Sequence, residues 1–515
     1  MTQAGATPYD DISYPGHPYE TTHPDRLATI GMLFGMNPVP ASRCRVLELG
    51  CGIGGNLIPM AYQYADSTFT GIDLSRTAIE TGLANVASVG LENISLRHAD
   101  IADVTEAWGQ FDYIVAHGVY SWVPPAVRQA MLAIFSKNLS PQGIAYVSYN
   151  AHPGSHLRDL VRDIMNFHVR DLKEPKQRIG QARAILKFVS ESSDANTVHG
   201  AVLRDQFARV LKMHDEVLFH DDLNVGSTPF LLHQVVADAQ QHGLQYLCDA
   251  SLSRRDLSKY SGAAREVLER FPDDEFMARD QFQDFIDGHG FRRTLLCHGN
   301  IALRRKLEPA LLKHFYLASS ARPVDPAMDP NATGIAEFKI ESGASLATDH
   351  RLSKAALLEL GRQWPGAIAY DDLIARASAR IAPPMGSAGE HEEHVEAARH
   401  ALFTGALRGH LELHTEPPAV AASVSGRPEA SRLARTQAER RQLITNLQHT
   451  GVLLEDERVR RLLMLVDGTR DLDALVADLK AATADVPPGP DDKPIDRASV
   501  ETHLKFLAGL ALLVR

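Results

Sequence analysis

The fold of this chain is decided by the stretch Val46-Leu47-Glu48-Leu49-Gly50-Cys51-Gly52-Ile53-Gly54-Gly55-Asn56. It opens as a short apolar run, continues through a cluster of glycines and leads into an apolar segment with helical spacing. Glycine lets a backbone turn tightly and approach a ligand at distances where a Cβ would collide. The free N–H groups at the start of the next helix suit a carboxylate or phosphate. The stretch therefore predicts a strand, a ligand-binding turn and a helix.

The same alternation of strand and helix continues to residue 149. Strands are expected at 45–49, 68–72, 94–97, 111–115 and 144–149, and helices at 55–64, 75–89 and 124–138. Apolar strands separated by amphipathic helices are typical of a parallel sheet covered on both faces. The predicted fold class is α/β, with a Rossmann-like sheet in the first third of the chain.

The rest of the chain predicts different units. Residues 155–306 follow a helical period, which favours a mostly helical middle domain. Two stretches starting near residues 356 and 461 share the order helix, short turn, helix, polar loop, helix and strand, which suits an α+β winged-helix-like module. The predicted divisions are a lead-in at 1–42, a sheet domain at 43–180, a middle domain at 181–308 and a C-terminal region at 309–515. The weak repeat suggests two copies of the module in that last region.

Charge and motif spacing exclude several functions. The net charge of −11 gives no support to a polyanion-binding surface, and Tyr370-Asp371-Asp372-Leu373 places carboxylates where a winged-helix module would contact DNA. We therefore expect no nucleic-acid partner. His391-Glu392-Glu393-His394 lacks the spacing that puts two histidines on one helical face, so no metal site is expected.

The expected compartment is the cytoplasm. The four cysteines include no C-x-x-C pair and are too few for a disulfide framework in 515 residues. No stretch reaches the ~18 apolar residues of a membrane span, and the N-terminus lacks the basic and apolar regions of a signal peptide. The oligomeric state is not predicted by any of these features.

Three further segments fall at the ends of predicted strands, where open α/β sheets bind ligands. Asp73, followed by Leu74, ends the second strand with a carboxylate that can accept both ribose hydroxyls. Asp100 follows the third strand and can accept the exocyclic amine of adenine, with Ile101 to cover the ring. His117 follows the fourth strand, where a transferred group should lie. Together with the glycine turn, these residues predict a cofactor that contains adenosine.

Gly50, Gly52 and Gly55 also satisfy G-x-G-x-x-G, so a nicotinamide cofactor has to be weighed. Glu48 would then lie beside a pyrophosphate that is already negative, whereas S-adenosylmethionine offers a positive α-amino group and a sulfonium. Asp100 has a role in binding the adenine of S-adenosylmethionine and none in the dehydrogenase interpretation. The residues therefore favour S-adenosylmethionine.

With these residues the chain resembles the class I methyltransferases. It more closely resembles a bacterial subgroup that carries a methyltransferase regulatory domain and includes the rickettsial outer-membrane-protein lysine methyltransferases. The resemblance covers nearly the whole chain, but its later segments do not fix the substrate. It is carried outside the glycine turn by Tyr14-Pro15, Thr22-His23-Pro24-Asp25-Arg26-Leu27, Tyr149-Asn150, Phe219-His220-Asp221-Asp222-Leu223-Asn224, Gly243-Leu244-Gln245-Tyr246-Leu247, Phe291-Arg292-Arg293-Thr294-Leu295-Leu296 and Leu465-Val466-Asp467-Gly468-Thr469-Arg470.

The resemblance implies S-adenosylmethionine as the cofactor and adds to the residues proposed from chemistry. Tyr14, in the lead-in, either closes over the cofactor or packs on the sheet edge. The predicted cofactor-binding residues are Tyr14, Glu48, Gly50, Gly52, Gly54, Asn56, Asp73, Leu74, Asp100, Ile101 and His117.

The acceptor side is less well defined. His117, Tyr120 and Asn150 follow strand ends and are the candidate catalytic or acceptor-site residues, and no general base is predicted. The subgroup, together with domains larger than a small metabolite would need, favours N-methylation of lysine side chains in a protein partner. A small-molecule methyltransferase and a non-catalytic scaffold that binds S-adenosylmethionine remain as alternatives.

Overall fold

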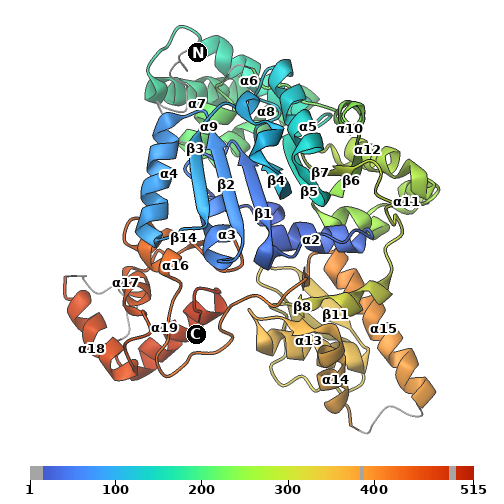
Figure 1. The fold of residues 1–515 in the computed structure, drawn as a ribbon, viewed down its shortest axis with the longest axis vertical. Coiled ribbons are helices and arrows are strands. Elements are labelled where there is room, and N and C mark those ends of the chain that lie inside the picture. The colour runs from blue at the N-terminus through green and yellow to red at the C-terminus, as the bar shows by residue number, and fades with distance from the viewer. Residues whose placement is uncertain (1–15, 225, 383–387, 486–493, 515) are drawn as a thin grey trace.

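A computed structural model describes residues 16–224, 226–382, 388–485 and 494–514 of the 515. Tyr14 lies outside these described residues. A large sheet with its helices fills the upper half of the molecule, and two smaller units lie below it (Figure 1).

The central element is a seven-stranded sheet in the order β3-β2-β1-β4-β5-β7-β6. The first five strands run parallel, as predicted, and the order reverses between β1 and β4. In open α/β sheets, ligands bind at the carboxyl ends of the strands beside such a reversal. The parallel strands are β1 (Arg45–Leu49), β2 (Thr68–Asp73), β3 (Ile94–His98), β4 (Phe111–Ala116) and β5 (Leu139–Asn150).

The two remaining strands come from the region predicted to be mostly helical. β7 (Phe291–His298) pairs antiparallel with β5, and β6 (Leu244–Asp249) pairs antiparallel with β7. Each follows a regular helix, α10 (Leu232–Gln241) or α12 (Phe276–Asp287), whose period dominates the local pattern. Because β7 pairs with β5, the middle region completes the first sheet instead of standing apart from it.

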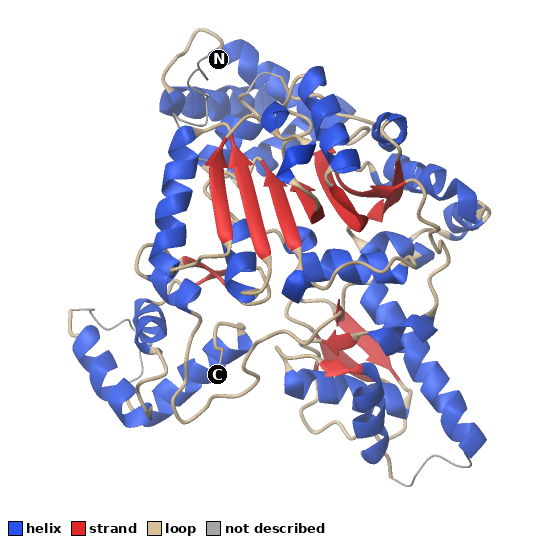
Figure 2. Ribbon diagram, viewed as in Figure 1, coloured by secondary structure: helices blue, strands red, loops and turns tan. Residues whose placement is uncertain are grey.

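Helices cover both faces of the sheet (Figure 2). Residues of α2 (Pro24–Leu33), α3 (Leu57–Gln63) and α4 (Arg76–Val89) share one apolar cluster with Val46 of β1. Residues of α5 (Pro125–Lys137) and α10 share a second cluster with Leu47 and Leu49. Because side chains alternate along a strand, Glu48 points to the first face, toward α2 and α3.

A separate helical unit stands at the carboxyl ends of the parallel strands, where the arrowheads point in Figure 2. Its own apolar core joins α6 (Ser155–Val169), α7 (Pro175–Ser192), α8 (Val198–Leu211) and α9 (Asp215–Asp221).

The last 200 residues form two units in which helices and strands follow one another in a similar order. In the first, α13 (Arg351–Gln363), α14 (Tyr370–Ala379) and α15 (Ala388–Leu407) precede β13 (Glu412–His414), which pairs with β8 (Tyr316–Ala318). In the second, α17 (Glu457–Leu465), α18 (Leu472–Ala482) and α19 (Arg497–Gly509) precede Leu513, which bridges to Ala430. The second unit has its own apolar core, together with α16 (Arg432–Ala438).

Within the described residues, none of the helices combines the length and apolar character that crossing a bilayer requires.

Candidate functional site

The glycine turn adopts the backbone that its sequence predicts. Gly50, Gly52 and Gly54 all have positive φ angles, of 78°, 54° and 74°. A Cβ on Gly50 would lie 2.6 Å from the Val119 side chain, whereas a Cβ on Gly52 would meet no atom within 4 Å. The turn is therefore packed on one side and open at Gly52.

Asp73 holds the turn from the end of β2. The Gly52 N–H donates to its Oδ2 and the Ser75 N–H donates to its Oδ1, both at 2.8 Å. Ser75 is also the N-cap of α4. One carboxylate thus fixes both the glycine turn and the start of the next helix; its contact with ribose stays a prediction.

Glu48 is a buried carboxylate with unused hydrogen-bonding capacity. The Asn56 Nδ2 donates to its Oε1 at 2.7 Å, and Oε2 has no hydrogen-bond partner among the described residues. Burial raises the pKa of Glu48 to about 7, Asp73 adds to the shift and Asn56 opposes it. A buried acceptor without a partner is costly, and the positive α-amino group of S-adenosylmethionine would satisfy it.

The lead-in covers this turn through Tyr19, and the predicted contact of Tyr14 lies outside the described residues. Gly16 lies on the glycine turn, because a Cβ on Gly55 would be 2.4 Å from the Gly16 carbonyl carbon. The Tyr19 N–H donates to Asn56 Oδ1 at 2.9 Å, and the Tyr19 ring stacks on His117 with centroids 3.8 Å apart. Burial and the neighbouring Glu48 raise the pKa of Tyr19 to about 12. The sequence predicted that the lead-in lies over the cofactor site, but it did not single out Tyr19.

His117 is held as a neutral imidazole. Its Nδ1 lies 2.9 Å from the Tyr146 hydroxyl and 3.4 Å from Ser148 Oγ, and its ring contacts Phe291 at 5.9 Å. Burial and the positive Arg293 lower the pKa of His117 to about 3. Burial also raises the pKa of Tyr146, so its phenol keeps a proton to donate to Nδ1. We infer from this network that the ring proton of His117 is on Nε2.

The residues predicted to contact adenine and ribose after β2 and β3 are more exposed than Glu48. Asp100 is exposed and its Oδ1 accepts the Ala102 N–H at 2.9 Å, which caps the turn Ile101–Asp103. Ile101 is half-buried, and Leu74 is 44 % exposed with its carbonyl 3.0 Å from His98 Nε2. These residues stand at the ends of β2 and β3, beside the open side of the turn.

The two other acceptor candidates, Tyr120 and Asn150, pack against the loop that precedes α10. Tyr120 is fully buried in the cluster on the α5 face, 5.3 Å from the Phe230 ring, and its hydroxyl has no partner among the described residues. Asn150 Nδ2 donates to Ser227 Oγ at 2.7 Å. Of the three, His117 contacts the described part of the lead-in, through Tyr19.

An acidic residue near Asn150 was not predicted as a site residue. Arg158 of α6 reaches Asn150 Oδ1 at 3.5 Å, pairs with Asp222 at 2.7 Å and lies 3.7 Å from the Asp221 carboxylate. Asp222 is fully buried in these ion pairs, whereas Asp221 is half-buried at the end of α9. Burial raises the pKa of Asp221 to about 6, Asp222 adds to the shift and Arg158 opposes it.

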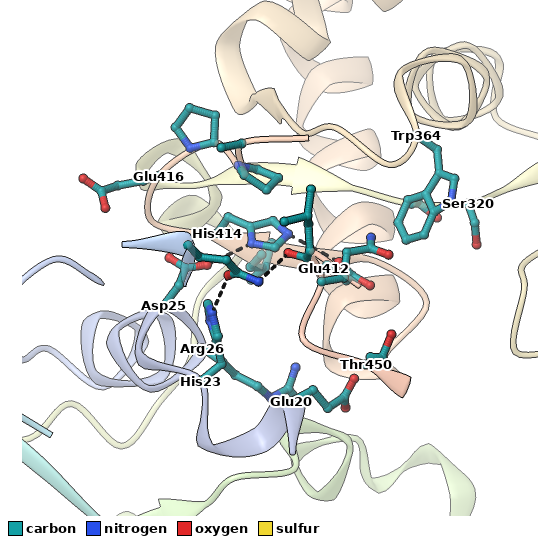
Figure 3. A pocket seen from close by; sticks show the side chains of 18 of the residues that line it. Glu20, His23, Asp25, Arg26, Ser320, Trp364, Glu412, His414, Glu416 and Thr450 are labelled. Atoms are coloured by element: carbon teal, nitrogen blue, oxygen red, sulfur yellow. Dashed lines mark hydrogen bonds and ion pairs between the residues drawn. The ribbon is translucent and has the colours of Figure 1, made fainter. Parts of the chain in front are cut away.

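A cleft of about 830 Å³ lies between the lead-in and the C-terminal units (Figure 3). One wall carries a buried ion pair, in which His414 Nδ1 donates to Asp25 Oδ2 at 2.9 Å. Burial opposes the charge on His414, but Asp25 and Glu412 outweigh it and raise the pKa of His414 to about 10. Within this wall, the pair joins α2 to β13.

The ion pair predicts a pH-dependent contribution to thermal stability. Because the pKa of His414 rises from 6.5 to about 10 on folding, its stabilisation is complete below pH 6.5 and is lost as the pH rises through about 10. We expect a His414→Gln variant to melt below the wild type at pH 6 and to match it above about pH 10. His400→Gln is the control, since His400 pairs with Glu396 at the surface. An equal deficit of His414→Gln at both pH values would contradict the assignment.

Comparison with known proteins places these features in a family. Three family models match: a methyltransferase domain at residues 46–143, a predicted methyltransferase regulatory domain at 214–298 and a PKMT C-terminal winged helix domain at 426–505. A protein of Rickettsia prowazekii is 34% identical over 386 residues, 74% of this chain and 69% of its own length. The structure of PKMT2 from Rickettsia typhi is 30% identical with a TM-score of 0.88, and the match covers 98% of this chain and 100% of that one.

The chain belongs to the same methyltransferase family as PKMT2. PKMT2 has also been solved in complex with AdoHcy, with the same TM-score of 0.88 and 29% identity. As a member of the PKMT2 family, the chain is an enzyme that uses S-adenosylmethionine. The predicted Rossmann-like sheet, regulatory domain and winged-helix region are confirmed.

Proposed function

We propose that this enzyme transfers methyl groups from S-adenosylmethionine to lysine side chains of a protein acceptor. The observation that carries the proposal is the likeness to PKMT2 along 98% of the chain, which includes the regulatory and winged-helix domains as well as the sheet. A small-molecule acceptor would not require so much shared structure outside the cofactor site.

The residues of the site divide between the cofactor and the acceptor. The cofactor supplies a methyl group on a sulfonium. In the proposal, Glu48 holds its α-amino group, Asp73 holds its ribose, and Asp100 with Ile101 holds its adenine. The stacked rings of Tyr19 and His117 would form one wall beside the lysine side chain, because aromatic rings attract a cation and pack on its methylene stem. Methyl transfer requires alignment above all, and these rings restrict the approach of the amine.

Asp221 is the proposed partner of the acceptor ammonium. A lysine amine has a pKa near 10.4 in solution and must lose a proton before it can attack. Asp221 is close enough to the lead-in to contribute to the raised pKa of Tyr19. Its own raised pKa, about 6, leaves it ionised at neutral pH and suited to accept a proton. Arg158 positions Asp221 next to Asn150 at the end of β5.

The proposal is tested by labelling. Protein incubated with methyl-labelled S-adenosylmethionine and a bacterial lysate is expected to place label in protein bands, recovered after hydrolysis as N-methyllysine. The Asp221→Asn variant should label about tenfold more slowly with unchanged cofactor affinity. Asp163→Asn, which changes an exposed carboxylate of the same helix α6, should label at the wild-type rate. Label found only in small molecules would contradict a protein acceptor.

A further inference from the structure

A hairpin of the C-terminal winged-helix region reaches the cofactor turn. It consists of β14 (Leu443–Thr445) and β15 (Gly451–Leu453), which pair antiparallel. Asn446 braces its tip: Asn446 Oδ1 accepts the N–H groups of Gln448 at 3.0 Å and Thr450 at 2.9 Å, and Asn446 Nδ2 donates to the Leu510 carbonyl at 3.1 Å. The tip is therefore fixed to the end of α19.

His449 stands at this tip and points into the enzyme. Its φ angle is 58°, a left-handed conformation that is uncommon for a residue with a side chain. The side chain is 1% exposed, and its ring lies 5.2 Å from the ring of His23 in the lead-in. Backbone strain at a buried polar residue is retained where the surroundings hold it in place.

The His449 ring makes one hydrogen bond, to the cofactor turn. Its Nε2 lies 2.8 Å from Asn56 Oδ1, and its Nδ1 has no hydrogen-bond partner among the described residues. Burial and the neighbouring His23 hold the pKa of His449 well below its usual value, so the ring is neutral. A neutral ring that bonds an amide oxygen through Nε2 carries its proton there and donates it.

The bonds around Asn56 determine which way its amide faces. Its Oδ1 accepts from the Tyr19 N–H and from His449, while its Nδ2 donates to Glu48 Oε1 and to Thr22 Oγ1. The Thr22 hydroxyl donates its own hydrogen to the Tyr19 carbonyl at 2.7 Å, so it accepts from Asn56. A flipped amide would place its oxygen against the Glu48 carboxylate and its NH₂ group against two donors.

We propose that His449 is a positioning residue of the cofactor site. It donates to Asn56, which keeps the Asn56 NH₂ group on Glu48 and leaves Glu48 Oε2 directed at the cofactor amine. The winged-helix region, 393 positions away in sequence, thereby helps to set the affinity for S-adenosylmethionine. This inference rests on the role proposed above for Glu48, and it does not depend on the identity of the acceptor.

The first test is calorimetric titration of the full-length protein with S-adenosylmethionine. His449→Gly removes the ring and suits the left-handed backbone of the tip, so the hairpin keeps its shape. We expect about three- to tenfold weaker binding, the worth of one hydrogen bond. His449→Gln should recover most of the affinity, because its amide N–H can donate from a similar distance. Leu453→Ser, exposed on the same hairpin, should bind as the wild type does.

The second test separates positioning from a general structural effect. In an Asn56→Ala background, His449→Gly should cause no further loss of affinity, because its partner is gone. An additional loss of the same size in that background would overturn the inference, as would wild-type affinity in His449→Gly alone. A wild type that binds the cofactor and shows the His449 effect but labels no protein would contradict only the lysine acceptor.

Discussion

Replacement of Asp73 by Ala is expected to weaken the binding of S-adenosylmethionine by about 100-fold. The Asp73 carboxylate receives the N–H groups of Gly52 and Ser75, so its loss frees the glycine turn and the start of α4 together. Hydrogen bonds to a charged group contribute more than neutral ones, and the variant also loses the proposed ribose contact.

The binding of the Asp73→Ala variant can be measured by calorimetry beside a matched control. Asp66→Ala removes an exposed carboxylate just before the other end of β2 and should leave the affinity unchanged. If Asp73→Ala bound the cofactor as tightly as the wild type, both the ribose assignment and the anchoring of the turn would be wrong.

Replacement of Arg292 by Ala should destabilise the sheet domain by about 3–5 kcal/mol. Arg292 on β7 is fully buried. Its guanidinium donates hydrogen bonds to Asp284 at 2.6 Å and to the Tyr246 hydroxyl at 3.0 Å, and it lies 3.4 Å from the Asp249 carboxylate. Its removal leaves buried carboxylates with too few positive partners, which is more costly than the loss of the pair itself. The destabilisation would be centred where β7 joins the middle region to the first sheet.

The lower stability of Arg292→Ala should appear as a first unfolding transition at a lower temperature, or at a lower denaturant concentration, than in the wild type. Arg265→Ala is the control, because Arg265 pairs with Glu269 at the surface of α11 (Gly262–Glu269), where such pairs contribute little. A melting profile of Arg292→Ala that overlaid the wild type would rule out a structural role for this buried network.

The sequence predicted the features that depend on neighbouring residues. The glycine turn, the strand that ends in Asp73 and the strand that precedes Asp100 all follow from local sequence patterns, and the structure places their ends at one edge of the sheet. Their contacts with the cofactor stay predictions.

The features that sequence reasoning did not find depend on distant contacts. β6 and β7 follow helices in the chain, and their place in the first sheet depends on the pairing of β7 with β5, which is distant in sequence. Tyr19 reaches His117 from a lead-in that Gly16 places against Gly55, a fit that spacing alone does not reveal. The contact of His449 with Asn56 has no local signature at all.

The insertion of β7 between β5 and β6 also bears on how the protein can be divided. A fragment that stopped at residue 180 would leave β5 as the outer strand of the sheet, with the edge of its buried residues 145–150 opposite β4 unpaired. Such an edge offers its free N–H and C=O groups to any other extended chain, which promotes aggregation. The smallest piece of this enzyme that closes its own sheet therefore extends to His298, and the helices α6 to α9 are carried inside it as an insertion.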